Sequence, residues 1–256
     1  MTSRRWRWLD SGAADGVTQM AVDAALMDRA RTHNEAVLRV YAWSEPTLSF
    51  GRHETVRGRF SESTLAARGV RAVRRATGGR VLLHDHEVTY SVTAPTDDDA
   101  PLPSTYAAIN ALLLDALRLL GVAATVAPGG APLRPGDATC FAEPSAGELV
   151  VGDRKLVGSA QVRERGALLQ HGSILLADDQ PRIAELADAP MTGSAPAATL
   201  TGAMGRAPSY AEVRDALLHA GRARFGAIDP LDPHELDSGV VSHRERFASP
   251  EWTWRR

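Results

Sequence analysis

The chain reads RRATGGR over residues 74–80, immediately after a short run, residues 70–74, that has the pattern of a strand. The adjacent glycines Gly78 and Gly79 let the backbone approach a ligand closely and turn its N–H groups inward. The arginines beside them suit a carboxylate, a phosphate or phosphopantetheine. By local criteria alone, a tight turn with a solvated basic surface explains this stretch equally well.

Strand and helix patterns alternate on both sides of this stretch. Strands are predicted over residues 37–43, 47–50, 88–94, 148–151, 154–163 and 166–176, and helices over 18–31, 61–69, 104–121 and 209–226. The strands come in antiparallel clusters with helices between them. This favours an α/β (α+β) fold with a mixed, largely antiparallel sheet flanked by helices over a regular βαβ repeat. No repeat or internal boundary divides the sequence, so residues 1–256 are expected to form a single domain.

Local signals define several of these ends. Thr18 is the predicted N-cap of the first helix, and Ser209 with Glu212 forms a capping box at the start of the last one. Residues 190–208 are rich in Ala, Pro, Gly and Thr and are expected to form a mobile flap. The tail from Ile228 is expected to be polar and irregular.

The composition is that of an ordinary globular protein. Apolar residues make up 44% of the 256 residues and charged residues 23%, so the chain can bury a sizeable core. A net charge of -2 gives no overall positive field for nucleic acid or an anionic membrane, and no run approaches the ~20 apolar residues of a membrane span. No apolar signal segment follows the N-terminus, and a lone cysteine excludes an internal disulfide and suits a reducing compartment. We expect a cytoplasmic protein that binds neither nucleic acid nor membrane.

The lone cysteine, Cys140, stands after a loop rich in Pro and Gly, residues 128–136, rather than in an apolar run. A free cysteine is by default a small buried hydrophobe. Lys155 follows a Gly-Asp turn on a predicted strand, and a lysine ammonium beside a thiol would lower the thiol pKa from about 8.5. A thiolate is what a cysteine nucleophile needs, although spacing alone does not establish the contact. Further along that strand, Gly158 and Ala160 share a face that leaves room for a narrow apolar tail.

Three histidines lie in polar motifs. His84 and His86 alternate on a predicted strand and so share a face, which makes a metal site conceivable. No cysteine partner is nearby, so a structural role is favoured and no metal is predicted. His171 lies on the strand expected beside that of Lys155, where a hydrogen-bonded structural histidine is more common than a catalytic base.

Three longer motifs then follow one another in order. They are RRATGGR at 74–80 with HD at 84–85 and EVTYS at 87–91, then KLVGSAQ at 155–161, then LQHGSIL at 169–175. Together they resemble the signature of the lipoate–protein ligase and octanoyltransferase family, and any one glycine turn would not be as specific. Weaker similarity at 20–23, 38–44 and 49–52 extends the resemblance over most of the chain, residues 6–255.

The resemblance implies a mixed sheet flanked by helices, a fold shared with biotin ligases and related to class II aminoacyl-tRNA synthetases. It also implies a tunnel for a medium-length acyl chain between the 75–79 loop and the 155–160 strand. The residues it assigns to acyl or substrate binding are Arg75, Thr77, Gly78, Gly79, His84, Gly158, Ser159, Ala160 and His171. Backbone N–H groups of the glycine loop or of the Lys155 strand are the expected oxyanion donors.

Two chemistries occur within this family. Ligases use ATP to make lipoyl-AMP, hold it with the lysine and usually need an accessory C-terminal domain. Transferases take octanoyl from acyl carrier protein, and one type does so through a cysteine in the loop before the lysine strand. Here CFAEPS at 140–145 resembles that cysteine motif, and the chain stops at 251–256, about where a ligase would continue into its accessory domain. We therefore expect a transferase in which Cys140 is the nucleophile and Lys155 lowers the thiol pKa and positions the acyl carbonyl.

The implied donor is octanoyl-acyl carrier protein. The implied acceptor is an apo lipoyl-domain protein, either the glycine-cleavage H protein or the acyltransferase subunits of 2-oxoacid dehydrogenases, with no bound cofactor and no ATP. The alternatives are an ATP-dependent ligase lacking its accessory domain, in which Cys140 is dispensable, and a non-catalytic binder of acylated carrier protein. Gln19 and Ala24 depart from the family's usual Asn and Glu, and Gly147 stands where a large aromatic residue is common. These departures bear on the carrier surface or the tunnel mouth.

Overall fold

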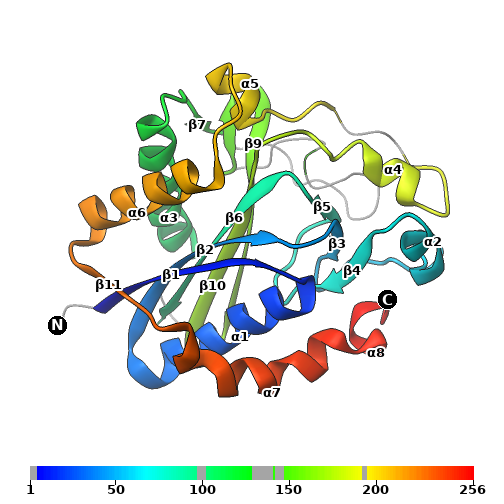
Figure 1. Ribbon diagram of the computed structural model, residues 1–256, viewed down its shortest axis with the longest axis horizontal. Coiled ribbons are helices and arrows are strands. Elements are labelled where there is room, and N and C mark those ends of the chain that lie inside the picture. The colour runs from blue at the N-terminus through cyan, green and yellow to red at the C-terminus, as the bar shows by residue number, and fades with distance from the viewer. Residues whose placement is uncertain (1–4, 97–101, 129–140, 142–146, 192–194) are drawn as a thin grey trace.

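The structure is a computed structural model that describes residues 5–96, 102–128, 141, 147–191 and 195–256. Within these residues an eight-stranded sheet forms the centre of the molecule, in the order β11-β1-β2-β6-β10-β9-β8-β7 (Figure 1). Its strands are β1 (Arg5–Ala14), β2 (Glu35–Trp43), β6 (Glu87–Pro95), β7 (Thr125–Val126), β8 (Leu149–Val151), β9 (Arg154–Glu164), β10 (Ala167–Leu175) and β11 (Ile228–Pro230). Strand β1 pairs in parallel with β2 and β11, and the other neighbours pair antiparallel. The predicted mixed, largely antiparallel sheet is confirmed.

Helices cover both faces of this sheet. Helices α3 (Leu102–Leu119) and α6 (Tyr210–Phe225) pack on one face, and α1 (Gly16–His33) with α7 (Asp237–Ala248) on the other (Figure 1). The alternation predicted for β2 decides which residue meets which layer: Leu38 and Val40 join the core under α3 and α6, whereas Val37 and Tyr41 face α1. Of the helices in the described part of the chain, none is long and apolar enough to cross a bilayer.

A second, smaller sheet lies beside the first. Strands β3 (Thr47–Phe50), β4 (Arg71–Arg74) and β5 (Leu82–His84) are arranged in the order β4-β3-β5 and are covered by the short helices α2 (Glu62–Ala67) and α4 (Arg182–Leu186). Leu48, Phe50 and Leu65 form part of its core. The RRATGGR stretch begins at the end of β4, as predicted. It leads into β5 and lies at the junction of the two sheets, since a Cβ at Gly79 would lie 3.9 Å from Ala160 of β9.

Two local predictions about helix ends have different outcomes. The capping box at Ser209 is confirmed, since its side chain accepts the N–H of Glu212 while the Glu212 side chain accepts the N–H of Ser209. The prediction of Thr18 as the first N-cap is wrong. Helix α1 starts earlier because Asp15 caps it, accepting the Thr18 N–H at 2.9 Å and the Thr18 hydroxyl at 2.6 Å.

The tail from Ile228 is not irregular, which corrects the sequence prediction. It contains β11, a short 3₁₀ helix η1 (Pro233–Leu236), α7 and α8 (Pro250–Thr253). Helix α7 was missed because few of its residues are apolar, Phe247 being buried and Val241 exposed. It packs on α1 through Phe247 and Val240 and through a close approach at Gly239, where a Cβ would lie 3.0 Å from the Cβ of Ala25. In the predicted flap, the described residues include the helix α5 (Leu200–Met204).

Candidate active site

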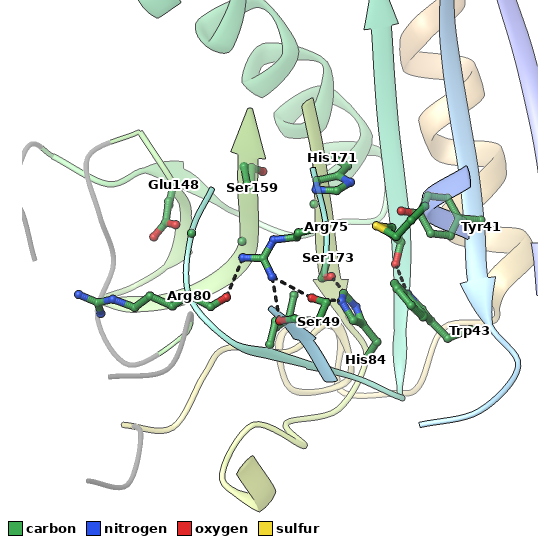
Figure 2. A pocket seen from close by; sticks show the side chains of 17 residues that line it. Tyr41, Trp43, Ser49, Arg75, Arg80, His84, Glu148, Ser159, His171 and Ser173 are labelled. Carbon is green, nitrogen blue, oxygen red and sulfur yellow. Dashed lines mark hydrogen bonds between the residues drawn. The ribbon is translucent and has the colours of Figure 1, made fainter. Parts of the chain in front are cut away.

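A pocket with a cavity volume of about 200 Å³ opens between the two sheets and α1 (Figure 2). Most of the predicted binding residues line it: Arg75, Gly79, His84, Gly158, Ser159, Ala160 and His171. Thr77 is behind the wall, in contact with His171, and Lys155 lies next to the lining residues Glu148 and Gly158. Cys140 lies outside the described residues.

The pocket has a mouth and a closed end. At the mouth Gly79 is exposed, and Arg80 and Ala160 are partly exposed. At the closed end Met20 and Tyr41 are 3% and 0% exposed and belong to the core beneath α1. Figure 2 shows Glu148 and Arg80 on one side of the pocket and Tyr41 with Trp43 on the opposite side. The burial gradient therefore gives the direction in which a chain-like ligand would enter.

The glycine loop at the mouth is shaped by Arg75. Its guanidinium donates to the carbonyl oxygens of Gly78, at 3.1 and 3.2 Å, and of Arg80 at 2.7 Å, and to both oxygens of Ser49 at 2.9 Å. All five N–H donors of this arginine thus have protein partners. Gly79 has a φ of +94°, a left-handed conformation that favours glycine. The loop is held in place from within, so Arg75 has a structural function besides lining the pocket.

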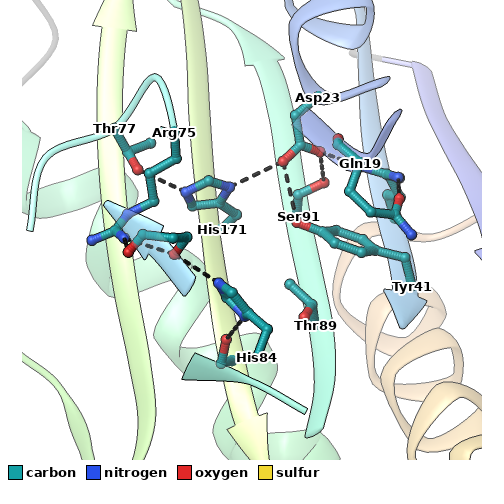
Figure 3. Close-up of polar contacts among 12 residues, drawn as sticks. Gln19, Asp23, Tyr41, Arg75, Thr77, His84, Thr89, Ser91 and His171 are labelled. Carbon is teal, nitrogen blue, oxygen red and sulfur yellow. Dashed lines mark hydrogen bonds and ion pairs between the residues drawn. The ribbon is translucent and has the colours of Figure 1, made fainter. Parts of the chain in front are cut away.

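A buried row of polar groups ties the glycine loop to α1 (Figure 3). His171 Nε2 lies 2.7 Å from the Thr77 hydroxyl and His171 Nδ1 lies 3.0 Å from Asp23 Oδ2. Asp23 also accepts hydrogen bonds from Arg39 NH1 at 2.6 Å and from the Ser91 hydroxyl at 2.8 Å. Burial by itself would raise the pKa of Asp23, but Arg39, His171 and Ser91 outweigh it and the pKa is lowered.

The Asp23 carboxylate therefore sets the tautomer of His171. With Nδ1–H donating a hydrogen bond to Asp23, Nε2 accepts a hydrogen bond from the Thr77 hydroxyl, so both ring nitrogens have a partner. This agrees with the structural function predicted for His171. Gln19, one of the departures noted in the sequence, bonds Arg39 through its side-chain oxygen and donates to the Ala42 carbonyl at 2.6 Å. It belongs to the scaffold behind Asp23.

His84 forms the floor of the pocket near its closed end. Its Nδ1 lies 2.8 Å from Glu87 Oε1 and its Nε2 2.7 Å from the Ser49 hydroxyl, and its ring stacks on Trp43 with centroids 3.8 Å apart. Burial lowers the pKa of His84 even though Glu87 opposes the shift. Glu87 Oε1 also accepts from Thr89 at 2.5 Å and Ser173 at 2.7 Å. The histidine is held neutral and immobile.

His84 and His86 do not share a face, contrary to the prediction. Strand β5 ends at His84, and the chain turns there before β6 begins, so His86 points outward. Within the described residues, His86 with Asp85 and Asp179 is a group close enough to hold an ion. Arg182 NH1 already lies 2.8 Å from Asp85 Oδ2 and 3.7 Å from Asp179 Oδ1, so its charge offsets theirs.

The mouth also contains a buried ion pair. Lys155 Nζ lies 2.5 Å from Glu148 Oε1 and 4.7 Å from the ring centroid of Phe141. A Cβ on Gly158 would lie 3.0 Å from both Lys155 Cε and Phe141 Cζ, so the glycine in this motif makes room for them. Phe141 is the chain neighbour of Cys140. Glu148 was not predicted as a site residue.

Register explains why Glu148 meets Lys155. The turn between β8 and β9 pairs Val150 with Lys155, which brings the residues before β8 alongside the start of β9. The sequence contains one signal for this pair. A carboxylate and an ammonium stand on opposite sides of a short predicted hairpin, where opposite charges can pair across the strands. Gly172 of the LQHGSIL motif is similarly explained, because a Cβ there would lie 2.5 Å from the carbonyl oxygen of Gly158 and 2.8 Å from the Tyr90 ring.

Comparison with known proteins accounts for this combination of fold and motifs. The model of the lipoyl protein ligase A/B catalytic domain matches residues 15–221, most of the chain. The chain belongs to this family. The family prediction made from the three motifs is confirmed.

Within the lipoyl protein ligase A/B family, several relatives carry the name octanoyltransferase LipM. The protein from Symbiobacterium thermophilum is 39% identical and the match covers 98% of each chain. The protein from Moorella thermoacetica is 42% identical over 69% of this chain and 67% of its own length. Among solved structures, a lipoate-protein ligase A bound with ATP superposes with a TM-score of 0.78 at 20% identity, covering 99% of both chains. A bi-partite lipoate protein ligase from Thermoplasma acidophilum superposes with a TM-score of 0.77 at 20% identity, covering 98% of this chain and 96% of the ligase chain. These last two show the fold.

Proposed function

We propose that this chain transfers an octanoyl group from acyl carrier protein to a lysine of an apo lipoyl-domain protein, through a thioester on Cys140. The wider class is an acyltransferase of lipoate biosynthesis, given relatives named octanoyltransferase at 32–42% identity. One observation carries the finer proposal. Lys155 is buried at the mouth of the pocket, with the ring of Phe141, the residue bonded to Cys140, 4.7 Å from its ammonium.

The pocket supplies the binding part of this proposal. Its walls combine apolar groups from Met20, Tyr41, Trp43 and Leu82 with glycines that keep a narrow passage open. An octanoyl chain inserted from the mouth would place its tail among the buried residues and leave its carbonyl at the mouth. Burying such a chain is worth about 0.8 kcal/mol for each CH₂ group.

Chain connectivity supports Cys140 as the nucleophile. Consecutive Cα atoms are about 3.8 Å apart, so the thiol belongs to the residue next to one that contacts Lys155. A cation beside a thiol favours the thiolate, which is the reactive form. Glu148 in turn holds Lys155 in a fixed position through the 2.5 Å ion pair.

The reaction then has two balanced steps. In the first, the Cys140 thiolate attacks the donor thioester; a new sulfur–carbon bond forms, the bond to pantetheine sulfur breaks, and the released thiolate takes up the proton that Cys140 gave up. In the second, the neutral amine of the acceptor lysine attacks the enzyme thioester; an amide forms, Cys140 leaves, and the amine proton passes to its sulfur. Splitting the transfer in this way predicts ping-pong kinetics.

No bound cofactor and no ATP enter this scheme, because the donor thioester is already an activated acyl group. A reducing cytoplasm is the compartment that keeps Cys140 a thiol. The acceptor is either the glycine-cleavage H protein or the acyltransferase subunits of 2-oxoacid dehydrogenases, as the family resemblance implies.

The test is the intact mass of the protein after incubation with octanoyl-acyl carrier protein in the absence of ATP. We expect an octanoyl adduct that hydroxylamine removes and that the Cys140→Ser variant does not form. Acylation of a lipoyl domain only with octanoate or lipoate plus ATP, undiminished in Cys140→Ser, would instead establish a ligase. Binding of acylated carrier protein without any turnover would establish a non-catalytic binder.

A further inference from the structure

Helices α7 and α8 end beside β4 (Figure 1). Two arginines pack against Trp252 of α8 there. The guanidinium of Arg246 lies 3.7 Å from the Trp252 ring centroid, and that of Arg255 lies 3.9 Å from it. The ring is itself fixed by its N–H, which donates to the Arg74 carbonyl at 2.7 Å. Cation–π contacts of this kind let one aromatic ring hold two like charges near each other.

Arg52 extends this cluster toward the pocket. Arg255 NH2 donates to the Arg52 carbonyl at 2.5 Å, so the two residues are in direct contact. Arg52, Arg246 and Arg255 are all partly exposed, and we call them the arginine surface.

The arginine surface holds more positive charge than its surroundings balance. In the part of the chain that the structure describes, its ion pairs amount to one contact, from Arg52 NH1 to Glu164 Oε2 at 3.6 Å. Burial and then repulsion from Arg52 lower the pKa of Arg246, with Glu164 partly opposing. Burial and neighbouring arginines likewise lower the pKa of Arg255. In a chain with a net charge of -2, this is a local field of the opposite sign.

The arginine surface is continuous with the rim of the pocket. The N–H of Arg52 donates to the Thr77 carbonyl at 2.8 Å. Its neighbour Gly51 packs so closely on the glycine loop that a Cβ there would lie 1.9 Å from the Gly79 carbonyl oxygen. Gly79 lines the pocket at its mouth. A donor that delivers an acyl chain into the mouth would therefore have its carrier close to these arginines.

We propose that the arginine surface is the docking site for acyl carrier protein, the donor in the proposed function on which this inference rests. The donor presents negative charge at the point of entry, because its pantetheine arm is attached through a phosphodiester. The acceptor of the second step brings a lysine instead, a cation that a positive surface repels. Charge complementarity therefore favours the donor over the lipoyl domain as the occupant.

The experiment compares two donors in steady-state transfer to an apo lipoyl domain. One is octanoyl-acyl carrier protein, and the other is octanoyl-N-acetylcysteamine, a thioester without phosphate or protein. Arg246→Glu and Arg255→Glu are expected to lower kcat/KM for the carrier donor by roughly tenfold each, mainly through KM. For the small donor we expect a change of less than about twofold, because long-range attraction does not act on a neutral molecule. Added salt should slow the wild type with the carrier donor only.

Two further variants keep this test sharp. Arg246→Lys retains the charge and should stay close to wild type, which separates charge from packing on Trp252. Arg118→Glu reverses a charge whose side chain is 75% exposed on α3, across the sheet, and should affect neither donor.

The docking proposal would be overturned if Arg246→Glu and Arg255→Glu lowered kcat/KM equally for both donors, or did not lower it for the carrier donor. A loss confined to transfer from preformed acyl-enzyme to the lipoyl domain would also overturn it, since that outcome assigns the surface to the acceptor. Failure of the wild type to form an adduct with either donor would contradict the proposed function, and the docking proposal with it.

Discussion

The mouth and the closed end of the pocket are built in opposite ways. At the mouth, charged side chains come from a short hairpin and a loop: Lys155 pairs with Glu148, and Arg75 holds the glycine turn. At the closed end, Met20 and Tyr41 are ordinary members of the core beneath α1. The difference indicates that chemistry and length selection are separable, because the residues that would govern each belong to different parts of the fold.

The largest expected effect is the loss of Lys155 from the mouth. Lys155→Ala should reduce octanoyl transfer by roughly a hundred- to ten-thousandfold, the usual weight of a positioned proton-transfer or charge-stabilising group. It also leaves Glu148 buried without this partner, which should lower the free energy of unfolding by about 3–5 kcal/mol. The double variant Lys155→Met/Glu148→Gln should recover most of that stability without recovering activity, as measured by urea unfolding and transfer rate. Recovery of activity would contradict the function proposed for Lys155.

Next in size is the buried row behind the glycine loop. Asp23→Asn breaks the ion pair with Arg39 and the bond to His171. We therefore expect the free energy of unfolding, measured by urea denaturation, to fall by about 3–5 kcal/mol at neutral pH. The folded state holds the pKa of Asp23 below its ordinary value, so its contribution is present above about pH 4 and is lost as pH falls through the lowered pKa. The free energies of unfolding of the variant and the wild type should therefore become equal in strong acid. Asp28→Asn, on the same helix but half exposed, is the control and should cost little.

Substitutions at the closed end of the pocket should change the preference of the enzyme for the length of the acyl chain. Met20→Ala removes the tip of a buried side chain there, so the enzyme should gain at least about tenfold in kcat/KM for decanoyl relative to octanoyl donors. Met27→Ala is the matched control, a buried methionine of the same helix packed in a different cluster. Both variants lose stability, but only the first should change the chain-length profile. The same profile in both would mean that Met20 does not limit the depth of the pocket.

The smallest effect is a pH dependence at His84. Burial lowers its pKa, so the fold favours the neutral ring; stability is complete above about pH 6.5 and declines as pH falls through the lowered pKa. The difference in unfolding free energy between the wild type and His84→Gln should therefore shrink from neutral to mildly acidic pH. A difference that stays constant over this range would show that His84 does not titrate with unfolding.

The sequence predicted the sheet and most of the pocket because their signals are local or lie in long motifs. Alternation in β2 and the glycine turn at 78–79 needed no tertiary information. Helix α7 was missed because few of its residues are apolar and part of its contact with α1 is made by Gly239, so no apolar period marks the helix. His86 was misplaced because a turn, not a strand, follows His84.

Long-range partners were beyond the reach of the motifs. Asp23 meets His171 across 148 positions of sequence, and that pairing is set by how α1 lies on the sheet. Met20 and Trp43 line the pocket for the same reason. The pairing of Glu148 with Lys155 is more local, since a short hairpin separates the two residues, but the sequence pattern marks Glu148 only as the first residue of a strand.

The competence of a Cys140 thioester is what most directly distinguishes this chemistry from its alternatives. Octanoyl-enzyme would be prepared, freed of donor, and mixed with an apo lipoyl domain without ATP while both masses are followed in time. We predict that the octanoyl group leaves Cys140 and appears on the lipoyl lysine in equal amount, at a rate no slower than steady-state turnover. An adduct that persists while the lipoyl domain stays unmodified would contradict a transferase that works through Cys140.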